Sequence, residues 1–322
     1  MDNTEWTDTI DITRSCLLEN INDWETRYED YAREIINKKD IISNDRNLFH
    51  KWHPLYVYLN ISQALSTTNH INFSLRFHGQ NVAKIFVKNN KVIISTKKFD
   101  STNGKHFSYK DSLDNIDWNS EKASNFRKFF SQAKIRTGNN EHRIESGLLK
   151  ELEGRSAKNK SLTNIQPIKI FDDARFQMPT PIAGSKKKNV KYSSFRGGGI
   201  DILARYKAGS NTRLCIIEVK DEYNNSEPPT KVLKQALAYA TFVQLLLRSK
   251  SGKEWWNLFG FSKPLPEKLD INVVCAMPVI DNPDKSFIGI TIPIENDTFH
   301  LHYIYFKDNK NSVKILETSL SS

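Results

Sequence analysis

Residues 197–220 form a stretch that reads GGGIDILARYKAGSNTRLCIIEVK. Its two apolar runs predict adjacent strands, because residues 207–211 supply the glycine, serine and asparagine that are typical of a turn. Each strand carries an acid where a buried strand would have an aliphatic residue, Asp201 in the first and Glu218 in the second. Lys220 follows Glu218 by two positions, so both side chains project from one face, roughly 6 to 7 Å apart.

Such a cluster of charges is unfavourable unless something compensates it. Two carboxylates about 4 Å apart repel each other by about 4 kcal/mol at an effective dielectric constant of about 20. A divalent cation bound between them reverses the sign of that interaction. We therefore interpret Asp201 and Glu218 as a metal site, with the Lys220 ammonium group beside it. The glycines at 197–199 are expected to let the backbone bend or a substrate approach closely.

The composition is typical of a soluble globular protein. The chain has 322 residues, of which 38% are hydrophobic and 26% charged, and no run approaches the roughly 18 apolar residues of a membrane span. The acidic, polar start MDNTEW does not resemble a signal peptide. Three widely spaced cysteines disfavour a disulfide framework or a cysteine zinc site. We expect a cytoplasmic protein that contacts no membrane.

The chain is strongly basic, with a formal net charge of +10. This excess favours binding to a phosphate backbone, although charge alone leaves a soluble basic protein without an acidic partner equally open. Basic residues interleaved with aromatics precede the Asp201 strand, namely Lys186, Lys187, Lys188, Lys191 and Arg196. They fit a loop that grips a nucleic-acid backbone and stacks on bases, and the alternative is a solvated loop without a partner.

Periodicity predicts two domains, residues 1–136 and residues 137–322, divided at the break Thr137-Gly138-Asn139-Asn140. The first is expected to be an α+β domain for recognition or regulation. Its predicted elements are a helix over 22–39, a shorter helix around 55–65, strands over 72–78, 82–88 and 91–96, and a helix over 118–133.

The second predicted domain follows the order helix, strand, strand, strand, helix, strand, with further strands after it. Beside the two strands already described, its expected elements are a helix over 141–153, a strand over 165–171, a helix over 230–248, a strand over 269–276, and antiparallel strands over 288–294, 299–306 and 313–316. We therefore expect an α/β protein, α+β overall.

The first of these helices carries an acid on its apolar face. Glu145 stands three, four and seven residues before Leu148, Leu149 and Leu152, so it shares their side of the helix. An acid on the packing side suggests a functional task. The alternative is that Glu145 lies at the edge of the apolar stripe, solvated or paired with Lys150.

The second helix places polar residues toward the same centre. Lys234, Thr241, Gln244 and Arg248 gather on one side and are expected to form its solvent-exposed face. Gln235 falls roughly 125° away at about 100° per residue, on the side that it shares with Tyr239. A glutamine there needs hydrogen-bond partners, which a site at the strand ends could provide. The alternatives are a glutamine that caps a loop carbonyl and a tyrosine that is ordinary core.

Together these residues resemble the PD-(D/E)XK nuclease superfamily over residues 141–276. The matching positions are Glu145, Gly199-Ile200-Asp201, Glu218-Val219-Lys220, Gln235 and Tyr239. The spacing of the last two resembles the Gln-x-x-x-Tyr helix of the RecB-like exonuclease branch. The chain departs from the motif before Asp201, where Gly199-Ile200 replaces the proline that names it.

The resemblance implies metal-dependent phosphodiester hydrolysis on an αβββαβ restriction-endonuclease-like core, with a central mixed sheet and extra C-terminal strands. Asp201, Glu218 and the Val219 carbonyl would hold Mg²⁺ or Mn²⁺, and Glu145 would contact the metal or its water. Lys220 would orient or activate the attacking water and offset charge in the transition state.

In the same family pattern, Gln235 would position Lys220, the metal ligands or the substrate backbone, and Tyr239 would support it. The predicted protein is a Mg²⁺-dependent deoxyribonuclease, with endonuclease or exonuclease action undecided, in a restriction, repair or phage-defence setting. Two alternatives stay open, a non-catalytic nucleic-acid-binding or scaffolding protein with the same fold and a nuclease that acts on RNA. The expected partner is nucleic acid, most of all DNA, and a homodimer is left open.

Overall fold

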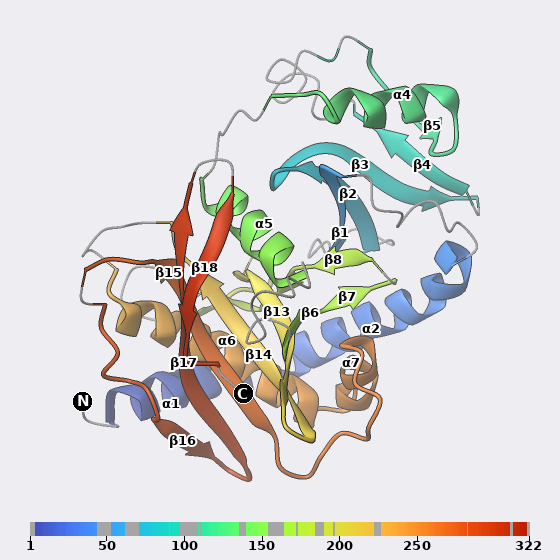
Figure 1. Cartoon of the computed structure of the whole chain (residues 1–322). Helices are drawn as coiled ribbons and strands as arrows, with labels where there is room; N and C mark the ends of the chain where they lie inside the picture. The colour runs from blue at the N-terminus through green and yellow to red at the C-terminus, as the bar shows by residue number, and fades with distance from the viewer. Residues whose placement is uncertain are drawn as a thin grey trace.

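The protein is a mixed α+β structure built on two large sheets (Figure 1). It is known from a computed structural model, which describes residues 4–43, 53–61, 71–89, 91–96, 109, 111–134, 140–153, 164–171, 173–183, 190–195, 197–221, 227–281, 283–309 and 312–320. None of the helices within these ranges is long and apolar enough to cross a membrane.

The first sheet has the strand order β5-β4-β3-β2-β1-β8-β7. Its strands are β1 (Leu55–Ile61), β2 (Ile71–Phe77), β3 (Gln80–Lys88), β4 (Lys91–Ser95), β5 (Ile116–Asp117), β7 (Lys169–Ile170) and β8 (Ala174–Phe176). The meander β2–β3–β4 was predicted and is confirmed. Asn89 has the positive φ of 50° expected of its turn. The helix α4 (Glu121–Phe130) belongs to this part of the molecule, and its Phe130 packs against Phe77.

The second sheet has the order β16-β17-β15-β14-β13-β6, with β18 paired to β17. Its strands are β6 (Ile165–Pro167), β13 (Ile202–Ala208), β14 (Asn211–Val219), β15 (Asp270–Pro278), β16 (Thr291–Ile294), β17 (Asp297–Asp308) and β18 (Val313–Thr318). β14, β15 and β17 run parallel, and the other pairs are antiparallel. The hairpin β13–β14 predicted for residues 197–220 is thus confirmed.

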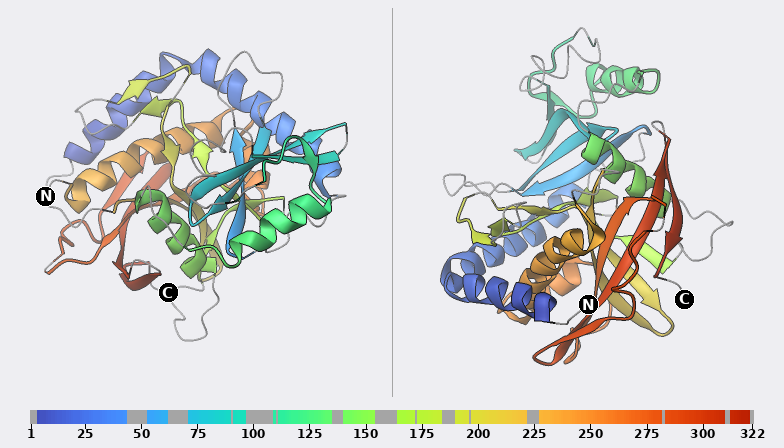
Figure 2. Two further views of the ribbon diagram at one scale, coloured as in Figure 1. Left: turned by 90° about the horizontal axis from the view of Figure 1, so that it is seen from above. Right: turned by 90° about the vertical axis from the view of Figure 1, so that its left-hand side faces the viewer.

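Helices cover both faces of the second sheet (Figures 1 and 2). α5 (Asn140–Glu153) packs its buried leucines on the face that includes Cys215 and Ile217. α6 (Pro229–Arg248) packs on the opposite face with Leu214 and Ile216. Because side chains alternate along a strand, Glu218 points to the same side as Leu214 and Ile216, toward α6.

The N-terminal helices form a further layer over α6. α1 (Thr4–Leu18) packs on α6, and α2 (Ile21–Ser43) contacts α7 (Gly252–Leu258) and β2. The ring of Trp24 meets Phe242 of α6 edge to face at 5.7 Å, and Tyr28 meets it at 4.9 Å. Sequence periodicity predicted α2 but missed α1, whose apolar positions are sparse.

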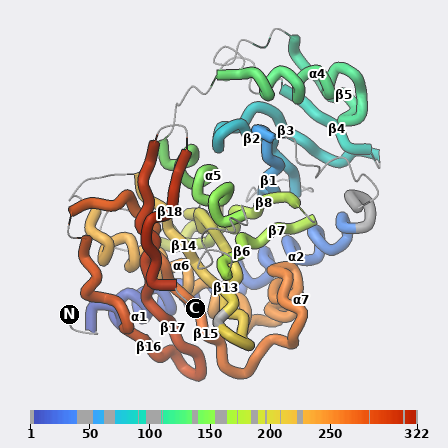
Figure 3. The backbone as a smooth tube through the Cα atoms, in the orientation of Figure 1, coloured from blue at the N-terminus to red at the C-terminus, as the bar shows by residue number. Residues whose placement is uncertain are grey.

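Two short two-stranded sheets connect the large ones. β9 (Met178–Pro179) pairs with β12 (Gly199–Ile200), and β10 (Ile182–Ala183) pairs with β11 (Lys191–Tyr192). β9 contacts β1 of the first sheet and β12 contacts β14 of the second, and Figure 3 labels β8 and the hairpin β13–β14 on either side of this part of the chain. The connection leading to Asp201 is therefore anchored to the region between the two sheets.

Several predicted elements differ from the observed ones. Residues 55–61 form the strand β1 and not a helix, because β2 and β8 pair with its two edges. The predicted strand 165–171 divides into β6 and β7, which belong to different sheets. The C-terminal strands are not all antiparallel, since β17 runs parallel to β15.

The expected solvent face of α6 was wrong. Thr241 and Gln244 are fully buried, and α1 packs over the helix. The Gln244 amide donates to Asp297 at 2.8 Å, and Arg248 binds the same carboxylate. The predicted boundary at residue 137 also does not separate the sheets, since β7 and β8 follow it in sequence but complete the first sheet.

Candidate functional site

Strand register brings Asp201 and Glu218 to the same end of the hairpin β13–β14. Ile202 pairs with Ile217, so Asp201 and Glu218 are the next residues beyond that pair. The Asp201 carboxylate accepts a hydrogen bond from the backbone amide of Val219 at 2.8 Å, which fixes its position against β14. Glu218 is buried, with 2% of its surface exposed. Two acids predicted to share a site from sequence are therefore neighbours.

Lys220 lies directly against this pair. Its Nζ donates to Glu218 Oε1 at 2.7 Å and is 3.5 Å from Glu141 Oε1, at the start of α5. Burial disfavours the charged form, but the carboxylates of Glu218, Asp201 and Glu141 outweigh it and raise the pKa of Lys220. Lys220 is therefore an ammonium group at neutral pH and not a free base.

Burial raises the pKa of both carboxyl groups, and neighbouring carboxylates add to the shift. Burial raises the pKa of Asp201 well above its usual range, and the charges of Glu218 and Glu145 raise it further. Burial also raises the pKa of Glu218 to about 7, with the Lys220 ammonium group opposing the shift. In the absence of a cation, the pair therefore favours holding a proton near neutral pH.

Glu145 approaches the pair from α5. Its side chain is buried, as the apolar-face argument predicted, and its charge acts on Asp201. Glu145 Oε2 accepts from Gln177 Nε2 at 2.7 Å and is 3.6 Å from His142 Nδ1. The side-chain oxygen Oε1 of Gln177 in turn accepts a hydrogen bond from Arg76 Nη1 at 2.8 Å. Because Arg76 belongs to β2, the first sheet is linked to the candidate site.

Gln177 and Glu141 were not identified from sequence. Gln177 reaches Glu145 only because it follows β8, which pairs with β1 from far earlier in the chain. No periodicity in its own segment signals that contact. Glu141 opens α5, where an acid at a helix start has an ordinary electrostatic explanation.

Gln235 and Tyr239 lie on the side of α6 that faces the site. Gln235 Nε2 is 3.3 Å from the Tyr239 hydroxyl. Burial and the nearby charge of Glu218 raise the pKa of Tyr239, so it stays a neutral phenol. A Cβ added at Gly198 would lie 2.2 Å from the Tyr239 hydroxyl oxygen. The absence of a side chain at Gly198 therefore allows the backbone there to lie close to α6.

The oxygen atoms at this site suit a hard divalent cation. Glu218 Oε2 and Glu145 Oε1 are buried and accept no hydrogen bond within the described part of the chain. Across the same residues, no group of three or more His, Cys, Asp or Glu side chains is arranged to hold a metal ion. Mg²⁺ is commonly bound through one or two carboxylates, with waters and phosphate oxygens completing the shell. Asp201 and Glu218 supply that number.

The predicted nucleic-acid contacts are described only in part. Lys191 is exposed on β11, and Lys186, Lys187, Lys188 and Arg196 lie outside the described residues. The segment around Lys191 is held by α2, because Arg27 Nη1 donates to the Ser194 carbonyl at 2.7 Å and Tyr192 bonds to Asp23.

Comparison with family models, with curated proteins and with solved structures finds no match to this chain. The residues of the site itself therefore carry the functional inference.

Proposed function

We propose that this protein is a metal-dependent nuclease that hydrolyses phosphodiester bonds in DNA. The observation that carries the proposal is the convergence of Asp201, Glu218 and Lys220 at one end of a hairpin, with Glu218 Oε2 buried and unpartnered among the described residues. Perturbed titratable groups that meet at one point are a mark of functional sites. The net charge of +10 further favours a polyanionic substrate.

The proposal includes a restriction-endonuclease-like core. Its elements would be α5, β6, β13, β14, α6 and β15, in the order helix, strand, strand, strand, helix, strand. β7 to β12 intervene between β6 and β13 but pair outside the second sheet. The extra strands β16, β17 and β18 extend that sheet at its C-terminal edge. This arrangement supports the family resemblance of the sequence motif.

Each residue of the candidate site has a separate role in the proposed hydrolysis. Asp201 and Glu218, with the Val219 carbonyl, would hold Mg²⁺ or Mn²⁺, which when bound acts as a Lewis acid on the scissile phosphate. Glu145 would contact the metal or its water. Because the carboxylates keep Lys220 protonated, it donates hydrogen bonds and offsets negative charge in the transition state. Lys220 therefore orients the attacking water and does not accept its proton. Gln235, held by Tyr239, would fix the position of the phosphate backbone.

The proposal is tested by incubating the purified protein with linear and circular, single- and double-stranded DNA and with RNA. Each substrate is offered with Mg²⁺, with Mn²⁺ or with EDTA. Cleavage of DNA should require the cation and fall by at least ~100-fold in Glu218→Gln and in Lys220→Met. Glu254→Gln and Lys253→Met are matched controls, because both side chains are exposed on α7, and they should cleave like the wild type.

Each outcome bears on one part of the proposal. Degradation confined to linear DNA identifies an exonuclease, and nicking of circles identifies an endonuclease. Cleavage confined to RNA corrects the substrate. Binding without cation-dependent cleavage favours a non-catalytic nucleic-acid-binding protein. Equal cleavage by the wild type, Glu218→Gln and Lys220→Met contradicts the assignment of the site.

A further inference from the structure

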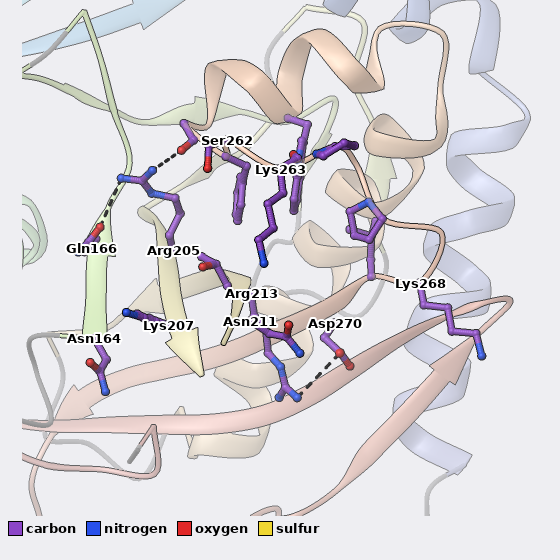
Figure 4. Close-up of a pocket in the computed structure, with 17 residues that line it drawn as sticks. Asn164, Gln166, Arg205, Lys207, Asn211, Arg213, Ser262, Lys263, Lys268 and Asp270 are labelled. Atoms are coloured by element: carbon purple, nitrogen blue, oxygen red, sulfur yellow. Dashed lines mark hydrogen bonds and ion pairs between the residues drawn. The ribbon is translucent and has the colours of Figure 1, made fainter. Parts of the chain in front are cut away.

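A cavity of about 440 Å³ lies at the opposite end of the β13–β14 hairpin from the carboxylates (Figure 4). The ends of β13 and β14 form one wall, and the loop after α7 forms another. Arg213 on this wall is five residues before Glu218, which is about 17 Å along a strand at about 3.4 Å per residue. The cavity is therefore separate from the candidate nuclease site.

Positive charge dominates the lining. The cationic side chains are Arg205, Lys207, Arg213, Lys263 and Lys268. Asp270 is the one acidic residue among the described residues that line the cavity, and its carboxylate already contacts two other side chains. Its Oδ1 is 2.7 Å from His300 Nε2, and its Oδ2 is 3.8 Å from Arg213 Nη2. Most of the cationic charge is thus uncompensated, and the cations repel one another unless an anion binds.

The hydrogen bonds of these cations leave their charge unmatched. Arg205 donates to neutral acceptors, the Gly260 carbonyl and Gln166 Oε1, and burial lowers its pKa. Lys207, Lys263 and Lys268 form no ion pair with any residue that the structure describes. An anion would supply what the described protein groups do not.

The loop after α7 fixes the wall that carries Lys263. The Trp256 indole donates to the Lys263 carbonyl at 2.7 Å, and the rings of Trp256 and Phe261 stack at 3.7 Å. Gly260 has a φ of 78°, and a Cβ there would lie 2.8 Å from Arg205 Nη1. In Figure 4 the Lys263 ammonium group extends into the cavity, whereas Lys268 points away from its centre. The backbone at Lys263 and the side chain of Arg205 are therefore held in place.

We propose that this cavity binds the polyphosphate group of a small ligand, a nucleotide or a free polyphosphate. Arginine and lysine together suit phosphate, because the guanidinium group binds it through two hydrogen bonds and the ammonium group adds a point charge. Several cations and a single acid favour a ligand with several negative charges. The volume falls in the range of small-ligand pockets, about 300–1,000 Å³. Trp256 and Phe261 line the same cavity and give it an apolar edge.

The proposal is tested by isothermal titration calorimetry of the full-length chain in a phosphate-free buffer without divalent cations. The probes are inorganic tripolyphosphate and ATP, titrated separately. Both should bind saturably, with Kd at least ~10-fold weaker in Lys263→Ala and in Arg213→Gln. Lys253→Ala removes an exposed lysine outside the cavity and should bind like the wild type. Melting temperatures confirm that each variant is folded.

The two ligand sources and the nuclease proposal are separated by the same titrations. Equal Kd values for tripolyphosphate and ATP identify the polyphosphate group alone as the ligand, and tighter binding of ATP identifies a nucleotide. Glu218→Gln should bind both probes like the wild type, whatever its nuclease activity. No saturable binding below about 1 mM, or equal Kd in Lys263→Ala and wild type, overturns the proposal. Lys263-dependent binding of a single-stranded oligonucleotide, without binding of tripolyphosphate, overturns it in favour of a nucleic-acid contact.

Discussion

At the scale of single residues, the carboxyl group of Glu218 is the most informative feature. One of its oxygens accepts from Lys220 and the other is buried with no partner among the described residues. A buried acid without full compensation destabilises the fold, and such groups persist where they have a task. Its raised pKa gives a direct way to measure that destabilisation.

In EDTA, wild-type protein should lose stability relative to Glu218→Gln as the pH rises from about 5 to about 8. The pKa of Glu218 is about 7 in the folded protein and has its ordinary value of 4.5 in the unfolded chain. The folded state thus binds this proton more tightly, so the stabilisation is complete below the ordinary pKa and is lost as the pH rises through about 7.

At pH 8 the glutamine variant should exceed the wild type in free energy of unfolding by about 1–3 kcal/mol, at about 1.4 kcal/mol per unit of pKa difference. Urea unfolding at a series of pH values measures the difference. Wild type and Glu218→Gln with parallel pH profiles would show that Glu218 is not held at a raised pKa.

The sequence identified some residues of the site and not others, for a physical reason. Asp201, Glu218 and Lys220 could be predicted because each lies within one hairpin, where local alternation decides which side chains face each other. Gln177 could not, because its contact with Glu145 depends on a strand pairing between β1 and β8 that no local pattern encodes.

At the scale of elements, the close contact between α6 and the chain entering β12 decides how the site is assembled. Gly198 lies against the Tyr239 hydroxyl, and Tyr239 carries the hydrogen bond of Gln235. This contact sets the separation between the helix that holds Gln235 and the strand that follows Asp201. Periodicity predicted both elements but not their contact.

Gly198→Ala should displace Tyr239 and lower the free energy of unfolding by about 1–3 kcal/mol. The added Cβ would lie 2.2 Å from the hydroxyl oxygen and 2.9 Å from Cζ of the Tyr239 side chain, which is buried. Gly199→Ala is the matched control, because a Cβ there meets only the Met178 carbonyl oxygen, at 3.8 Å.

Urea denaturation of the two alanine variants measures the effect. Combining Gly198→Ala with Tyr239→Phe should recover part of the lost free energy of unfolding, because the Tyr239 hydroxyl oxygen, the atom nearest to the added Cβ, is removed. Equal stability of Gly198→Ala and Gly199→Ala would contradict the described contact.

The faces of α6 show where helical periodicity fails. Thr241 and Gln244 were predicted to be solvent-exposed because they are polar, yet both are buried. Their polarity is satisfied locally, since Thr241 donates to the Leu237 carbonyl and Gln244 donates to Asp297. A polar stripe therefore predicts the exposed face of a helix only when no other element of the fold packs over it.

At the scale of the whole molecule, the N-terminal helices complete the core of the C-terminal half. Trp24 and Tyr28 of α2 are buried against Phe242 of α6, and the Trp255 indole donates to the Tyr28 carbonyl at 3.2 Å. One buried cluster includes residues from both sides of the predicted boundary. The break at Thr137 to Asn140, from which two domains were predicted, gives no sign that residues on both sides of it share one core.

A fragment of residues 137–322 should therefore fail to fold cooperatively on its own. It would expose the α6 face covered by α1 and α2, and β8 would lose its pairing with β1. Loss of a single large aromatic core residue costs about 3–5 kcal/mol, and the fragment loses several such contacts. Near-UV circular dichroism and urea unfolding of the fragment, beside the full-length chain, measure this. A sharp unfolding transition in the isolated fragment would contradict the shared core.

The two ends of the β13–β14 hairpin carry opposite charge. Carboxylates gather at one end, where we propose divalent cation binding, and cations gather at the other, where we propose polyphosphate binding. The first of these is the central claim, because the proposed nuclease chemistry depends on it.

Titration of the full-length protein with Mn²⁺ at pH 8, by isothermal titration calorimetry without nucleic acid, tests that claim most directly. Wild type and Glu254→Gln should bind Mn²⁺ saturably with equal Kd. Glu218→Gln should bind at least ~10-fold more weakly, because it loses a charged ligand while retaining the same shape. Equal Mn²⁺ affinity in Glu218→Gln and wild type would contradict a cation site at Asp201 and Glu218.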